Sequence, residues 1–130
     1  MTATAETTRA VSLTVPAKPE YVVLARLALG AVCRLAPLTP EEVGDLKLAM
    51  TEAAALVVAS AHADGEEAVV RFVFDVQDDR VLLEVFGTGD PATPQEEREL
   101  SAAIIQATVD EYERSGDRQA LVKLLRKPSE

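Results

Sequence analysis

The chain has 130 residues, of which 48% are apolar, which is the usual size and composition of one domain with its own hydrophobic core. Its 22 acidic and 13 basic residues give a net charge of −9, so nucleic acid is not expected as a partner, because phosphate binding needs clustered lysine and arginine. A basic protein surface is the expected partner instead, although such acids also keep a small domain soluble.

Two features predict where the protein works. Residues 1–8 are small and polar and lack the apolar run of a secretory signal, and no apolar stretch reaches the roughly 20 residues that a bilayer requires. The single cysteine, Cys33, cannot form an internal disulfide, and with the single histidine, His62, it cannot make a structural zinc site. We therefore expect a flexible tail over 1–8, one domain over 9–127, and a cytoplasmic protein without metal or membrane contact.

The first third of the chain predicts a strand and a helix. Residues 9–15 alternate apolar and hydroxyl side chains, which is typical of a half-buried strand. A helix is expected over 19–36, with Pro19 in its first turn and Cys33 as a small buried residue within it rather than a reactive thiol. The predicted core face of this helix comprises Val23, Leu24, Leu27, Ala28, Ala31 and Leu35.

A second helix is expected from Pro40 to about residue 61. Thr39 and Glu42 form a capping-box pattern around Pro40, a residue that is favoured at the first helical position. The residues predicted to face the core recur every three or four positions, and they are Val43, Leu46, Met50, Ala53 and Val57.

A hairpin and a loop follow the second helix. Residues 69–76 and 81–86 are rich in β-branched and aromatic side chains, and the connection between them is short enough for antiparallel pairing. Residues 87–94 contain glycines and prolines throughout and are expected to form a loop.

A third helix is expected over 95–113, with Thr93 as its N-cap, and a last strand over 120–125. The predicted core residues of the helix are Leu100, Ala103, Ile104, Ala107 and Val109. The order β-α-α-β-β-α-β predicts an α+β two-layer sandwich in which a mixed β-sheet carries its helices on one face.

Several stretches, in order, resemble one family. The string Asp45-Leu-Lys-Leu-Ala-Met-Thr-Glu-Ala-Ala-Ala-Leu56 is similar to the family's helix with a Glu-Ala-x-x-Asn box, and Val85-Phe-Gly-Thr-Gly-Asp-Pro91 is similar to the approach to its Asp-x-Gly-x-Gly box. Residues 100–111 and 121–126 resemble the last helix and the final strand. The chain thus resembles the RsbW/SpoIIAB-type anti-sigma serine kinases of the histidine-kinase/Hsp90-like ATPase superfamily, which has the Bergerat fold.

The resemblance implies an ATP site whose specific positions are altered here. Leu56 stands where the family has the asparagine that holds Mg²⁺, and Gly87 stands where it has the aspartate that binds adenine, with Gly89 keeping the next glycine. Asp90 would replace that aspartate only if the loop were shifted. Glu52 matches the family's general base, and its alternative role is a solvated acid on an alanine-rich helix.

Two further family features are also altered. The glycine-rich turn that cradles the phosphates should lie near residues 99–101, where no glycine occurs. Glu96, Glu97 and Glu99 would instead repel a triphosphate. His62 lies two residues beyond the position of the family's histidine and is expected to be a helix-end residue.

Three interpretations stay open. In the first, the chain is a regulator that binds a sigma factor or its antagonist, as a homodimer, with no cofactor and no kinase activity. In the second, it is an active serine/threonine kinase that uses ATP and Mg²⁺ with Glu52 as base. In the third, it is an unrelated α/β domain that binds a small ligand or serves as an accessory subunit, and neither Glu52 nor residues 87–90 have a special role. The sequence does not decide whether the chain is an enzyme.

Overall fold

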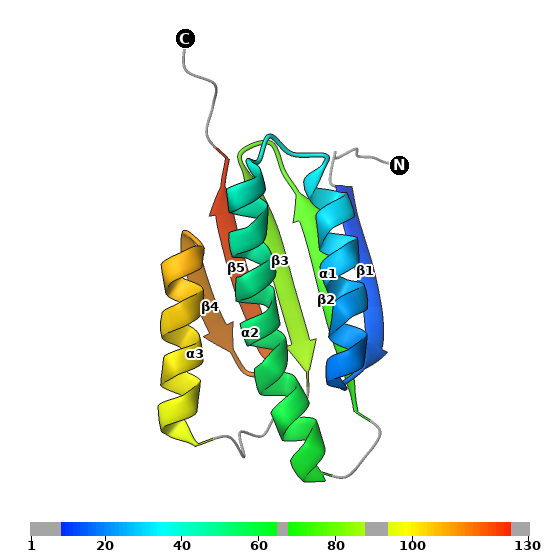
Figure 1. Cartoon of the computed structure of the whole chain (residues 1–130), viewed down its shortest axis with the longest axis vertical. Helices are drawn as coiled ribbons and strands as arrows, with labels where there is room; N and C mark the ends of the chain where they lie inside the picture. The colour runs from blue at the N-terminus through cyan, green and yellow to red at the C-terminus, as the bar shows by residue number, and fades with distance from the viewer. Residues whose placement is uncertain (1–8, 65–67, 88–93, 126–130) are drawn as a thin grey trace.

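Three helices cover one face of a five-stranded antiparallel sheet in this computed structural model, which describes residues 9–64, 68–87 and 94–125, with the backbone alone for residues 9 and 60–64 (Figure 1). The strand order is β1-β2-β3-β5-β4. The elements in chain order are β1 (Arg9–Pro16), α1 (Pro19–Cys33), α2 (Pro40–Asp64), β2 (Val69–Val76), β3 (Arg80–Gly87), α3 (Gln95–Thr108), β4 (Glu111–Ser115) and β5 (Arg118–Leu124).

The predicted α+β two-layer sandwich with its helices on one face is confirmed, but the sheet is antiparallel rather than mixed. The cause is β4, a strand that the sequence analysis missed. The chain reverses three times between β3 and β5, into α3, into β4 and into β5, so β5 returns antiparallel to β3. A single helix in that connection would have made the two strands parallel.

The start of α2 is the feature that the sequence predicts best. The Thr39 backbone N–H donates to Glu42 Oε1 at 2.9 Å, and the Glu42 N–H donates to Thr39 Oγ1 at 3.1 Å, which is the reciprocal capping box. The predicted core face of α2 is also confirmed, with Val43 partly buried and the others fully so. This central helix packs on the sheet between its two neighbours.

The predicted core face of α1 is wrong, and the helix ends at Cys33 rather than at 36. Its buried residues are Val22, Ala25, Leu29, Val32 and Cys33. Most of the predicted core side chains point to solvent instead, and Leu27 is 66% exposed. The helix is apolar on both sides, so apolar spacing alone fits either face. Burial raises the pKa of the Cys33 thiol, against an opposing effect of Lys47, in keeping with a small buried residue.

The prediction for 95–113 is also corrected. The third helix ends at Thr108, its N-cap is Pro94 rather than Thr93, and it buries Ile105 while Leu100 is 63% exposed. The following strand β4 turns into β5 through Gly116, whose φ of 61° suits the first central position of a two-residue hairpin loop. The Ser-Gly-Asp sequence over 115–117 is a turn signal that could have revealed this hairpin.

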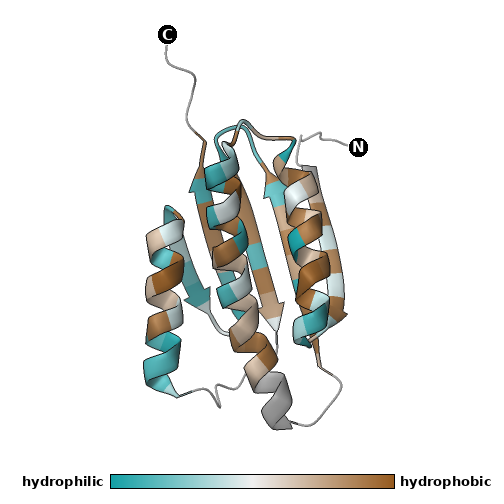
Figure 2. Ribbon diagram, viewed as in Figure 1, coloured by the Kyte–Doolittle hydropathy of each residue, from teal (hydrophilic) through white to brown (hydrophobic). Residues whose placement is uncertain are grey.

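The hairpin of β2 and β3 and the last strand β5 are confirmed within one or two residues at their ends. Alternate residues of β2 and β3 face the helices and are buried. Hydropathy along the ribbon shows apolar residues on α1 and α2 and a polar N-terminal half of α3 (Figure 2). Within the described residues, none of the helices has the length and apolar character needed to cross a bilayer.

Candidate functional site

Glu52 lies on α2 at its contact with α3. Its side chain is half-buried, and Oε1 accepts a hydrogen bond from Ser101 Oγ at 3.1 Å. The carboxylate that the resemblance implies as a general base therefore joins the two helices here. Ser101 was not singled out as its partner, because residues 49 positions apart meet only in the folded chain.

Gly87 ends β3 directly against α2. A β-carbon at this position would lie 2.2 Å from Cγ1 and 2.7 Å from Cγ2 of Val57. Real β-carbons do not approach other atoms so closely, so only glycine fits while valine stands opposite. The aspartate that the resemblance implies at this position would have no room beside Val57.

The remaining space beside this contact is very small. The hollow lined by Leu56, Val57, Gly87 and Gln119, together with the turn residues 114, 116 and 117, has a volume of about 10 Å³. One water needs roughly 10–15 Å³, and small-molecule sites run to roughly 300–1,000 Å³. Leu56 itself is 6% exposed and adds no oxygen ligand toward this space.

A chain of buried hydrogen bonds lies beside the same hollow, on the side of the sheet. Tyr112 Oη donates to Gln119 Oε1 at 2.7 Å, and Gln119 Nε2 donates to the Ala53 carbonyl oxygen at 3.0 Å. Gln119 is 3% exposed, so these bonds satisfy an amide that water does not reach. Burial raises the pKa of Tyr112, against an opposing effect of the nearby Arg114 guanidinium, and the neutral phenol is kept as a donor.

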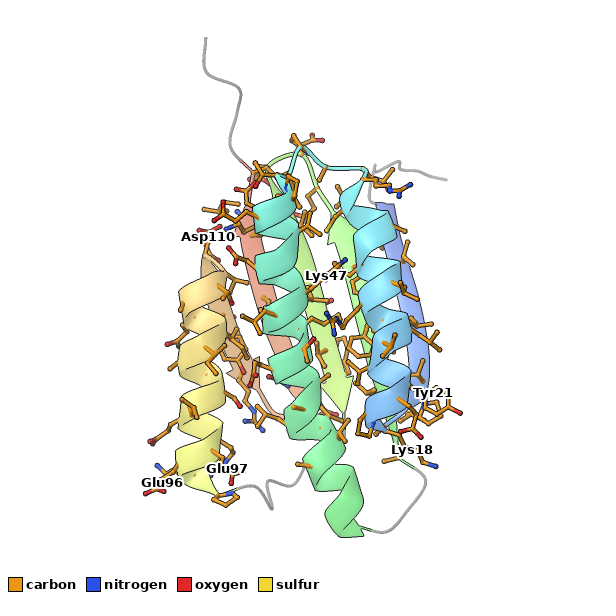
Figure 3. All side chains as sticks on the ribbon, in the orientation of Figure 1. Lys18, Tyr21, Lys47, Glu96, Glu97 and Asp110 are labelled. Atoms are coloured by element: carbon orange, nitrogen blue, oxygen red, sulfur yellow. The ribbon has the colours of Figure 1, made fainter. Side chains whose placement is uncertain are left out.

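The stretch expected to hold a phosphate-cradling turn is an unbroken helix. Residues 99–101 lie within α3, whose backbone amides beyond the first turn bond within the helix. Glu96, Glu97 and Glu99 are exposed on this helix, and Figure 3 shows the first two at its N-terminal end. They line none of the hollow at Gly87.

Three predicted positions lie outside the described residues. These are Gly89 and Asp90, which follow β3 in the sequence, and the side chain of His62, whose backbone alone is placed in α2. Within the described ranges, no three His, Cys, Asp or Glu side chains gather closely enough to hold a metal ion.

A larger hollow among the described residues lies elsewhere. A groove of about 590 Å³ runs between α1 and α2, lined mostly by apolar side chains, and Arg26 is the charged residue among its described lining. Its lining residues are Pro19, Val22, Val23, Arg26, Thr51, Ala55, Val58 and Ala59. It contains none of the positions that the resemblance connects with nucleotide.

The comparison with known families decides the assignment. Residues 15–124 match the histidine kinase-like ATPase domain family, which covers most of the chain. The chain belongs to this family.

Similar members of the histidine kinase-like ATPase family are serine-protein kinases named RsbW. The chain is 33% identical over 107 residues to that of Bacillus subtilis, covering 82% of this chain and 67% of the relative. It is 34% identical over 114 residues to that of Bacillus pumilus, covering 85% and 70%. The kinase of Listeria innocua is 33% identical over 79 residues, covering 61% and 50%.

Glu52, the residue that the resemblance matches to the family's general base, lies on α2. The described side chains around Gly87 do not fit Mg²⁺·ATP, since they leave about 10 Å³ where β3 meets α2 and the Leu56 side chain offers no ligand. Sequence reasoning found Leu56 and Gly87. It gave Val57 only as a core residue of α2 and did not single out Gln119. The apolar run Leu56-Val57-Val58 is the signal that could have indicated a filled site.

Proposed function

We propose that the chain is an anti-sigma regulatory factor that binds a sigma factor, or the antagonist of that interaction, without transferring phosphate. Its RsbW relatives support the regulatory role through the resemblance described above. The observation that supports the loss of kinase chemistry is the close approach of Val57 to Gly87, the position that the resemblance matches to the adenine-binding aspartate. A homodimer in the cytoplasm, without bound nucleotide or Mg²⁺, is part of the proposal.

An acidic surface on α3 and β4 supports a basic partner. The exposed acids at the start of the helix and along the edge strand are Glu96, Glu97, Glu99, Asp110, Glu111 and Glu113. Figure 3 shows Glu96 and Glu97 near one end of this surface and Asp110 near the other. A sigma factor carries basic surfaces for DNA, and such a surface is attracted by clustered carboxylates.

An active kinase is the second candidate, because Glu52 is retained on α2 and the relatives carry the name of serine-protein kinase. Two observations argue against a kinase: Glu52 accepts a hydrogen bond from Ser101, and Val57 fills the space beside Gly87. If the chain is a kinase, residues 88–93 must supply the nucleotide contacts that the described residues lack.

Two measurements on the full chain separate these functions. Proteins that co-purify with the chain in its host are identified by mass spectrometry, and the recovered complex is then incubated with radiolabelled ATP and Mg²⁺. We expect a sigma factor or its antagonist in the complex and no label on protein. Labelled phosphate on a serine of the partner would establish the kinase instead, and a complex with neither protein would contradict the regulatory role.

Neutralising the acids of α3 is expected to weaken the complex. The triple substitution of Glu96, Glu97 and Glu99 to glutamine should slow association and raise the Kd about tenfold at low salt, with less effect at high salt. The control pair Glu41→Gln and Asp78→Asn removes exposed charges on α2 and at the β2–β3 turn. Surface plasmon resonance over a salt series measures both. Equal Kd values for the triple variant and the wild type would show that this surface does not meet the partner.

A further inference from the structure

The solvent side of α1 is an apolar surface. Val23, Leu24 and Leu27 are each about half exposed or more, and Leu35 extends the row just beyond the helix end. The opposite side of the helix is the buried side that packs on the sheet. A helix that is apolar all round is normally covered on both sides, and a cluster of exposed large apolar residues marks a protein contact.

Two opposite charges bracket this surface with equal spacing. Glu20 lies seven residues before Leu27 and Arg34 lies seven residues after it, and all three are exposed. Seven residues make almost two helical turns, so the three side chains share one face and are spaced about 10 Å apart along the axis. Within the described part of the chain, neither Glu20 nor Arg34 forms an ion pair.

This pattern is complementary to itself when reversed. In an antiparallel pair of α1 helices related by a two-fold axis at Leu27, Glu20 lies opposite Arg34 of the second copy, and the reverse pair forms at the other end. The exposed apolar residues then meet between the two ion pairs. A parallel pair would place like charges together at both ends, which is unfavourable.

We infer that the exposed face of α1 is the interface between two copies of this chain, with Leu27 on the two-fold axis and Glu20 paired with Arg34 of the other copy at both ends. The two helices cross at a shallow angle of about 20°, because a steeper crossing separates residues two turns from the axis. This assignment rests on the homodimer proposed above and is independent of which regulatory partner is bound.

The first test uses Leu27. Because its side chain is 66% exposed in the single chain, Leu27→Lys places two like charges on the axis without disturbing the core. We expect the dimer Kd from sedimentation equilibrium to rise about a hundredfold, as for a central contact residue. Leu100→Lys is the matched control, since Leu100 is 63% exposed on α3, and it should leave the Kd unchanged. Thermal unfolding monitored by circular dichroism confirms that each variant is folded.

The second test uses the charges. Glu20→Arg and Arg34→Glu should each weaken self-association about tenfold, because each variant faces like charges twice in its own dimer. The double substitution should restore the wild-type Kd, and an equimolar mixture of the two single variants should form a heterodimer.

The outcomes distinguish this interface from the proposed function. Dimers that persist unchanged with Leu27→Lys would place the contact elsewhere and overturn the α1 interface while the homodimer stands. A wild-type chain that stays monomeric at all concentrations would overturn the interface and the homodimer together. Partner capture and phosphate transfer are measured separately and are unaffected by either result.

Discussion

Replacing Gly87 by alanine is expected to lower the free energy of unfolding by about 2–3 kcal/mol. The added β-carbon would lie 2.2 Å from Cγ1 of Val57, and both residues are buried where β3 meets α2. In an ordinary strand the same change would stabilise the chain, because glycine is unfavourable there. The sign of the effect therefore reports the contact, and urea unfolding followed by circular dichroism measures it.

Val57→Ala provides the matched partner for this variant. Alone it should cost about 2 kcal/mol through the cavity it leaves. In the double variant the new methyl group at position 87 occupies that cavity. The loss of unfolding free energy in the double variant should therefore be about 1–2 kcal/mol smaller than the sum of the losses in the two single variants. Gly44→Ala is the control, since a β-carbon there meets no atom within 4 Å, and alanine in a helix interior should raise stability by up to about 1 kcal/mol. If the losses of Gly87→Ala and Val57→Ala add up in the double variant, the close contact between these two residues is contradicted.

Replacing the Gln119 amide by an apolar group is expected to have the second large effect on stability. Gln119→Leu should cost about 2–3 kcal/mol, because the Tyr112 hydroxyl loses its buried acceptor and the Ala53 carbonyl loses a donor. Tyr112→Phe alone should cost about 1 kcal/mol. The double variant should be more stable than the sum predicts, since it removes both polar partners rather than leaving one unsatisfied. Urea unfolding of the four proteins measures this cycle, and a coupling energy of zero would contradict the chain of hydrogen bonds.

The same tyrosine gives a pH dependence with a defined sign. Burial raises the pKa of Tyr112 above its ordinary value of 10.0 in the folded chain. The unfolded chain therefore ionises first, and stability that is fully present below about pH 10 is lost as the pH rises through the folded-state pKa. In Tyr112→Phe this part of the alkaline loss should disappear, while the part from Cys33, whose pKa is also raised, should remain.

The sequence predicts those elements whose signals are local. The capping box of Thr39 and Glu42 needs only neighbouring residues, and the hairpin of β2 and β3 has strong β-branched runs. The buried side of α1 could not be predicted, because its apolar residues surround the helix and the choice depends on how the helix packs on the sheet. The polar strand β4 lacks an apolar alternation and is held mainly by its pairing with β5.

The candidate site divides in the same way. The altered positions Leu56 and Gly87 are visible by position in the chain. The loss of space at Gly87 cannot be predicted from the sequence, because it depends on how closely β3 approaches α2 and on Val57 lying opposite Gly87. Gln119 reaches the same corner from β5, 66 residues beyond the carbonyl it binds, and no local pattern marks it.

The most direct test of whether the site is filled by side chains is a titration of the full chain with ATP and Mg²⁺. Binding is measured by isothermal titration calorimetry and by thermal unfolding. The RsbW kinase of Bacillus subtilis serves as the positive control. We predict no heat of binding and no change in Tm, since a bound ligand at about a hundred times its Kd would add about 2.7 kcal/mol of stability. A saturable heat with a micromolar Kd and a matching rise in Tm would contradict the account.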